Sequence, residues 1–186
     1  MDTVSFTRMK DGTKEDYELL ERAEKPYHAL TADRILAELR RQDEDTLSGY
    51  KITRMAHGLQ AATRARRDGA DIDWIVGALL HDIGDGLAPQ NHDRFSAEVI
   101  RPFVRDEVAW VVEHHGIFQM LYYARHYGWD ENARDRFKDD IHFKACRISA
   151  NAGTRARSTR IIRPIRSKAL KLWSGRCSRA RPTIRP

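Results

Sequence analysis

The sequence predicts an all-α domain, and three observations point to this class. Apolar residues recur at helical spacing through much of the first 146 residues, for example at Ile52, Met55 and Leu59. No segment alternates apolar and polar residues in the way that a half-buried strand does. The sequence also lacks an internal repeat and a glycine-rich phosphate loop. Because 186 residues suit one domain with a sizeable core, we expect a single helical bundle.

Two helices are expected before a polar loop at 43–50. Thr13 can cap the first, which runs to about Ala23, with Asp16 in the position of a capping box. Thr31 can cap the second, whose apolar face consists of Ile35, Leu36 and Leu39.

The next two helices carry the strongest patterns. One is expected from about Ile52 to Arg67, ended by Asp68-Gly69. The other begins at Asp71 or Asp73, and Gly84 suits its C-terminal cap. It is apolar nearly all round, so it belongs in the centre of the bundle. Its apolar residues are Trp74, Ile75, Val76, Leu79, Leu80 and Ile83.

The remaining helices are shorter or more polar. Asn91 can cap a short helix that Pro102 stops, and a valine-rich helix runs from Val104 to His115. Gly116 to Tyr127 is aromatic and apolar, and Asp130 to Cys146 is a charged stretch with helical character.

Charge divides the chain near Cys146. The last forty residues contain 12 Lys plus Arg and no acid, so residues 1–146 carry a net charge of −6 and residues 147–186 carry +12. We therefore expect a helical domain at 1–146 and a disordered basic tail at 147–186.

Two cysteines are too few for a disulfide framework, and the chain shows neither an apolar signal core nor an apolar run long enough to span a bilayer. We expect a cytoplasmic protein without a membrane partner.

Imidazoles fall on four of the expected helices. His57 lies mid-helix, His81-Asp82 closes the central helix, His92 follows Asn91, and His114-His115 ends the valine-rich helix. Imidazole nitrogens and carboxylate oxygens suit zinc, iron or manganese, and a carboxylate can bridge two ions. A lone helical histidine is more often a packed or surface residue, and we assign His28, His126 and His142 to that class.

The ordered set resembles the HD-domain superfamily of metal enzymes, over about Ser5 to Cys146. The similarity is greatest to a small subgroup of predicted HD phosphohydrolases related to the di-iron phosphonate and inositol oxygenases. The matching stretches are "HGLQAATRARRDGA", "ALLHDIGD", "LAPQNH" and "EHHGIFQ".

The resemblance implies two metal ions, of iron, manganese or zinc. His57, His81 and Asp82 would bind the first, and Asp82 would bridge to a second held by His92 and His115. Asp82 and His115 are also the residues expected to be catalytic. His115 is preferred over His114 because the family's ligand stands where "HG" stands here. Arg64 and Asp85 are possible pocket residues, although a solvated face explains each about as well.

Two kinds of chemistry fit such a centre. In a phosphohydrolase, two ions activate water and stabilise the charge that develops on a phosphate ester. In a mixed-valent di-iron oxygenase, one ion binds a small organic substrate and the other activates O2. The related phosphonate oxygenases place a basic residue four positions after the last histidine, where this chain has Gln119. The sequence therefore favours the hydrolase acting on a small phosphorylated substrate, with the oxygenase as the alternative.

The basic tail is open to two interpretations. A segment of +12 would bind polyanions non-specifically, but Trp173 is its only aromatic residue and no nucleic-acid module is present. We expect no specific nucleic-acid partner.

The tail also fits a frameshifted version of the family's acidic, aromatic C-terminus. If the first two bases of the Arg147 codon are skipped, the codons spanning Ala152 to Arg155 allow Trp-Asp-Gln. That aspartate is the natural candidate for the sixth metal ligand that the resemblance implies. Without it, we expect fewer than two metals per subunit and little activity.

Overall fold

The computed structural model describes residues 2–44 and 49–154, and all statements below on the fold concern these residues. They form seven α-helices, several short 3-10 turns and no strand, which confirms the all-α prediction. The helices are α1 Lys14–Ala29, α2 Thr31–Arg41, α3 Arg54–Arg67, α4 Ile72–Leu80, α5 His92–Ile100, α6 Asp106–Tyr123 and α7 Phe143–Thr154. Among them, none combines the length and the apolar character that crossing a bilayer requires.

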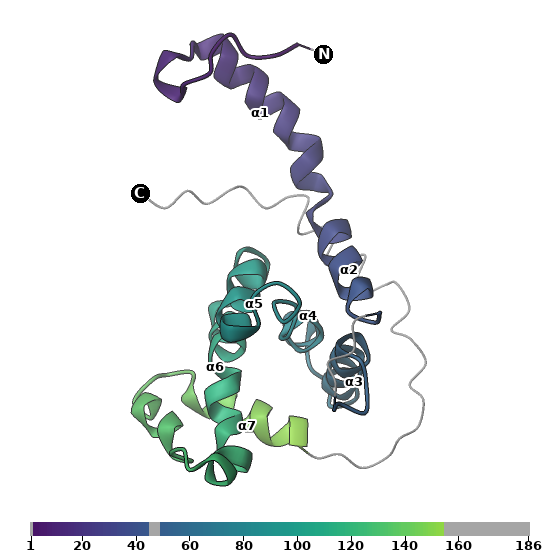
Figure 1. The fold of residues 1–186 in the computed structure, drawn as a ribbon, viewed down its shortest axis with the longest axis vertical. Coiled ribbons are helices and arrows are strands. Elements are labelled where there is room, and N and C mark those ends of the chain that lie inside the picture. Colours follow the sequence, from purple (N-terminus) through teal and green to yellow (C-terminus); the bar gives the residue numbers. More distant parts are fainter. Residues whose placement is uncertain (1, 45–48, 155–186) are drawn as a thin grey trace.

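The core lies where α3, α4, α5 and α6 meet. In Figure 1, α4 lies between α3 and α5, and α6 runs down to α7. Leu80 and Ile100 are almost completely buried at the centre of this core. A second cluster joins α6 to α7 through Val111, Phe118 and Cys146. The bundle is thus closed by apolar faces from consecutive helices, as the sequence pattern predicts.

Helix α1 projects from the bundle and reaches it through α2 (Figure 1). Its start is fixed by the predicted capping box, in which the Thr13 hydroxyl accepts from the Asp16 amide and the Asp16 carboxylate accepts from the Thr13 amide at 3.0 Å. The helix runs six residues beyond the predicted end at Ala23 and includes Pro26. At α2, the prediction of a Thr31 cap is wrong. Thr31 is the first helical residue, and its hydroxyl donates to the carbonyl of His28.

The central helix is shorter than expected. Asp71 caps it by accepting from the amides of Asp73 and Trp74, and α4 ends at Leu80 rather than near Gly84. His81 and Asp82 therefore lie in the turns just beyond the helix, where their side chains can leave the apolar core.

The last third of the chain departs most from expectation. The two segments expected on either side of Gly116 form one helix, α6. Its glycine faces α5, where an added Cβ would lie 3.2 Å from the Asp93 carboxylate. The charged stretch from Asp130 is mostly turns and one 3-10 segment, Ala133–Phe137, until α7 begins at Phe143.

Helix α7 crosses the boundary predicted at Cys146 and continues to Thr154. The division into 1–146 and 147–186 remains a prediction. Residues 155–186, and with them most of the expected disordered or frameshifted tail, lie outside the described residues.

Candidate metal centre

Four histidines and one aspartate from four elements converge at one point in the bundle. His57 comes from α3, His81 and Asp82 from the turns after α4, His92 from the start of α5, and His115 from α6. They form two groups whose potential ligand atoms all lie within 4.8 Å of one another, and Asp82 belongs to both. The groups are His57, His81 and Asp82, and Asp82, His92 and His115.

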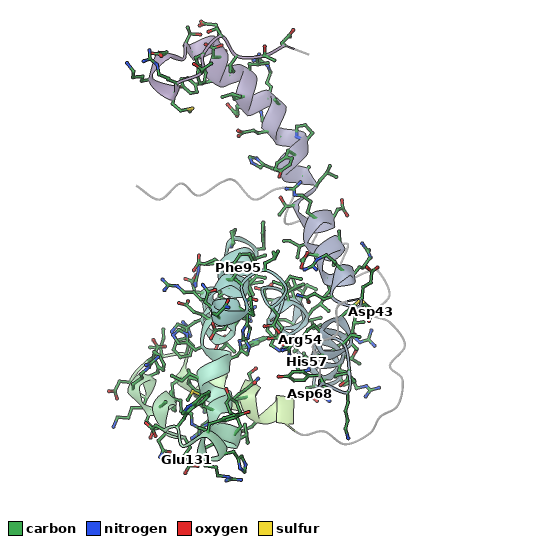
Figure 2. All side chains as sticks on the ribbon, in the orientation of Figure 1. Asp43, Arg54, His57, Asp68, Phe95 and Glu131 are labelled. Atoms are coloured by element: carbon green, nitrogen blue, oxygen red, sulfur yellow. The ribbon has the colours of Figure 1, made fainter. Side chains whose placement is uncertain are left out.

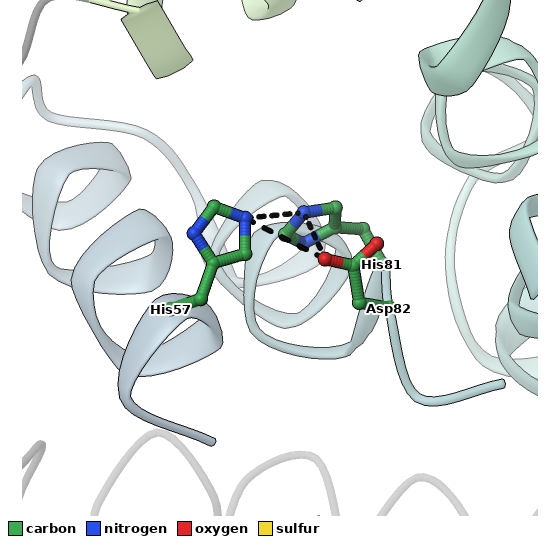
Figure 3. A group of neighbouring side chains, drawn as sticks. All are labelled: His57, His81 and Asp82. Carbon is green, nitrogen blue, oxygen red and sulfur yellow. Dashed lines mark hydrogen bonds and ion pairs between the residues drawn. The ribbon is translucent and has the colours of Figure 1, made fainter. Parts of the chain in front are cut away.

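Asp82 divides its two oxygens between the two groups. Its Oδ2 lies 3.5 Å from Nε2 of His57 and 3.3 Å from Nε2 of His81. Its Oδ1 lies 3.5 Å from Nε2 of His92 and 3.2 Å from Nε2 of His115. Figure 3 shows the first group, in which the rings of His57 and His81 point toward the same carboxylate oxygen and their Nε2 atoms are 3.1 Å apart. This is the arrangement that a carboxylate bridging two cations needs.

Backbone carbonyls orient three of the four rings. The Nδ1 atoms of His81 and His115 donate to the carbonyls of Ala78 and Val112, each three residues earlier, at 2.9 and 2.6 Å. The Nδ1 atom of His92 lies 3.2 Å from the carbonyl of Pro89. Because a carbonyl can only accept, these bonds place the proton on Nδ1 and direct Nε2 at Asp82. A second hydrogen bond of this kind is typical of histidines that hold metals.

Burial and charge set the protonation states of the cluster. Burial lowers the pKa of His57, and it lowers the pKa of His81 to about 4, so both rings are neutral near pH 7. Burial opposes ionisation of Asp82, but its histidine neighbours, His81 first, hold its pKa well below its usual range. For His115, burial is outweighed by the hydrogen bond to Asp82, which raises its pKa. A divalent cation would take the place of that proton.

The donor set fits divalent metal ions. Neutral imidazole nitrogens and an ionised carboxylate are the ligands that zinc, iron and manganese accept, and all five side chains are at least partly shielded from water. Neither group contains a second carboxylate within the described part of the chain. The roles of His57, His81, Asp82, His92 and His115 as ligands, and of Asp82 and His115 in catalysis, remain predictions that this geometry supports.

His114, the neighbour of His115 in the sequence, belongs to neither ligand group. The ring of His114 stacks on Trp110 at 4.1 Å between centroids and meets Phe137 edge-on, so it packs in the α6–α7 cluster. His115, the neighbour that was preferred, is the residue that reaches Asp82.

Arg54 is a residue of this cluster that sequence reasoning missed. It lies beside His57, one helical turn earlier in α3 (Figure 2), and forms ion pairs with Asp85 and Asp82. The three-residue spacing from His57 was visible in the sequence, but nothing there showed which way the guanidinium points. Asp85 was named only as a possible pocket residue. Its side chain is 6% exposed, and it contacts Nδ1 of His92, the ring nitrogen that does not face Asp82.

A cavity of about 690 Å³ opens beside the cluster, between α3, α4, α6 and α7. His57, His81 and His115 lie in its wall, together with Arg64, which was also named as a possible pocket residue. Most of the wall is apolar, and Gln119 and Ser149 are among its polar residues. The wall also includes Cys146, whose thiol pKa is raised to about 12 by burial, so this thiol is inert.

Comparison with known proteins gives the family to which the chain belongs. The HD domain family matches residues 53–150, more than half of the chain and every residue of the cluster. The chain belongs to the HD domain family. A curated relative is the [1-hydroxy-2-(trimethylamino)ethyl]phosphonate dioxygenase (glycine-betaine-forming) of Leisingera caerulea. It is 37% identical over 87 residues, which cover 41% of this chain and 44% of the relative, so the match spans less than half of that protein. Family membership and the histidine–aspartate cluster support a metal-dependent function for this HD-domain chain.

Proposed function

We propose that this chain is a dinuclear metal-dependent enzyme that uses O2 to cleave a small phosphonate. The observation that carries the proposal is the division of the Asp82 oxygens between two histidine groups. Two iron ions held by these five residues would supply the redox chemistry that O2 requires. The preference for oxidation over hydrolysis comes from the relative named a phosphonate dioxygenase.

The chain's own residues have separable tasks in this proposal. His57 and His81 on one side of Asp82, and His92 and His115 on the other, would each hold one ion together with Asp82. Arg64 lies in the wall of the adjacent cavity and is close enough to His57 to lower its pKa, so it supplies positive charge where an anionic substrate would lie. The apolar remainder of the wall excludes water from the reacting atoms.

The proposed reaction balances without a further reductant. A 1-hydroxyalkylphosphonate and one O2 give a carboxylate, phosphate and a proton. The carbon–phosphorus bond breaks, carbon is oxidised to the carboxylate level, and both atoms of O2 enter the products. Phosphate release must therefore equal O2 consumption.

A phosphohydrolase is the second candidate, and Gln119 favours it. This residue lies in the cavity wall four positions after His115, where the related phosphonate oxygenases have a basic residue. A neutral amide there would weaken binding of a dianionic phosphonate. In this case the two ions would activate water for attack on a phosphate ester.

Metal analysis with paired O2 and phosphate assays separates the two candidates. The protein is loaded with Fe²⁺ and, separately, with Mn²⁺ or Zn²⁺, and supplied with 1-hydroxyalkylphosphonates or with p-nitrophenyl phosphate. We expect O2 uptake equal to phosphate release, with iron only, and at a low rate because only three side chains hold the first metal. Phosphate release without O2 uptake would establish the hydrolase, and no metal bound under any condition would refute both.

A further inference from the structure

A second carboxylate, that of Asp85, contacts the cluster without belonging to either ligand group. Asp85 follows Asp82 by one turn, and its Oδ1 lies 3.2 Å from Nδ1 of His92. Its Oδ2 lies 2.5 Å from Nε of Arg54. The same guanidinium places a terminal nitrogen 3.7 Å from Oδ2 of Asp82. Arg54 therefore stands between the two carboxylates and links them.

These contacts lie on the far side of His92 from the proposed metal. Nδ1 of His92 faces Asp85 and the carbonyl of Pro89, while Nε2 faces Oδ1 of Asp82 at 3.5 Å. The hydrogen bond from Nδ1 goes to Pro89, and the Asp85 carboxylate lies beside the same nitrogen as an ion pair. A carboxylate beside the outer nitrogen fixes the ring orientation and makes the inner nitrogen a stronger donor to a cation. His92 needs such support more than His115 does, since it is 28% exposed at its side chain and its bond to a backbone carbonyl is long.

Arg54 holds Asp85 in place for this task. Its Nε and the Asp85 Oδ2 are both buried and meet as an ion pair, without the alignment of a regular hydrogen bond. The ring of Tyr50 covers the guanidinium at 4.7 Å. Because Arg54 is in the first turn of α3, it also fixes the α3 end that carries His57 against the turns that carry Asp82.

We infer that Asp85, held by Arg54, is a positioning residue that orients His92 toward the metal held with Asp82 and His115. The inference rests on the proposed metal centre and extends it. It assigns Asp85 neither to the ligands nor to substrate contact.

Titration with Co²⁺, followed by its visible absorption and by calorimetry, tests the inference on the full chain. Asp85→Ala should weaken the affinity of the group that contains His92 by about tenfold to a hundredfold. Asp85→Asn keeps an oxygen beside Nδ1 of His92 but removes the charge, so it should lose only part of that affinity. Because asparagine has nearly the same size as aspartate, this variant also separates loss of the contact from loss of the fold.

Arg105→Ala is the matched control. Arg105 also joins two carboxylates, with 2.8 Å to Asp71 and 3.4 Å to Asp73, but it contacts none of the cluster residues. We expect this variant to bind Co²⁺ as the unaltered chain does. If Asp85→Ala binds Co²⁺ with unaltered affinity, or if Arg105→Ala loses as much, the inference is wrong. If the unaltered chain binds no Co²⁺, the metal centre itself is wrong, which is a different result.

Discussion

Gly58 is the position where one added methyl group should perturb both the fold and the candidate site. It lies in α3 directly after His57, and a Cβ there would stand 2.5 Å from the carbonyl oxygen of Leu79 in α4. A backbone atom cannot rotate away, so α3 must move. Overpacking of this kind costs about 1–3 kcal/mol. Since alanine is favoured over glycine in a helix by about 1 kcal/mol, the net loss for Gly58→Ala is about 1 kcal/mol.

Gly116→Ala is the matched control because it makes the same change in another helix of the cluster. Its Cβ would stand 3.2 Å from the Asp93 carboxylate, which can move by rotation of a half-buried side chain. The helix preference then dominates, and a gain of up to about 1 kcal/mol is expected. The two variants should differ by about 2 kcal/mol in free energy of unfolding, measured with urea on metal-free protein.

A displaced α3 should also separate His57 from His81, whose Nε2 atoms are 3.1 Å apart. We expect Gly58→Ala to weaken metal binding at this pair more than Gly116→Ala does. Equal stability of the two variants would show that α3 and α4 do not approach as closely as the structure has them, and would refute the reasoning.

Three further changes test separate parts of the molecule. Arg64→Gln should raise KM for an anionic substrate severalfold with little effect on kcat, because Arg64 lines the cavity without belonging to either ligand group; an unchanged KM would remove it from the substrate site. Leu80→Ala should cost about 2–5 kcal/mol, since its side chain is 1% exposed at the centre of the core; denaturant unfolding measures this, and a loss below 1 kcal/mol would contradict the packing. Hydrogen bonds from Thr13 and Ser5 lower the pKa of Asp16 to about 2 from 3.8, so its contribution to the start of α1 is complete above about pH 4 and is lost as the pH falls toward 2. Asp16→Asn should speed amide exchange in the first turn of α1 at pH 6 and remove that pH dependence.

The parts of the fold that the sequence predicted are those with strong local signals. Thr13 and Asp16 form the expected capping box, and the apolar run around Leu80 is the buried centre. Gly116 misled the prediction because a glycine within an apolar segment resembles a helix end. Its role is to let the Asp93 side chain approach α6, and only the packing of α5 on α6 shows this.

The candidate site was also predictable where a motif carries the signal, and not where packing decides the contact. The order of the histidines predicted which side chains gather, because family motifs record a tertiary arrangement that periodicity alone does not contain. Helical phase could not separate His114 from His115, whereas the stacking of His114 on Trp110 does so in the structure. Arg54 was missed because an arginine near a helix start is usually a solvated residue, and its ion pairs depend on where α4 ends.

The end of α7 links the candidate site to the abrupt change of composition after Cys146. Ser149 and Ala150 of this helix line the cavity that His57 and His81 also line. Position 153 follows Ser149 and Ala150 by four and three residues in the sequence, the spacing at which residues of a helix share one face. In the shifted reading frame, the codon formed from Gly153 and Thr154 is the one that allows aspartate.

We therefore predict that Gly153→Asp alone adds a carboxylate ligand to the first metal. His57, His81 and Asp82 offer only three ligand side chains, so the unaltered chain should hold the first metal weakly and keep fewer than two metals per subunit after dialysis, even where excess metal fills both positions. Gly153→Asp should raise the metal content toward two, measured by elemental analysis after dialysis. Asn151→Asp is the control because it adds the same charge where the side chain accepts a hydrogen bond from Tyr122 instead. Equal metal content in both variants, or a gene in which the shifted frame gives no Trp-Asp-Gln after the Cys146 codon, would reject the sixth ligand at this position.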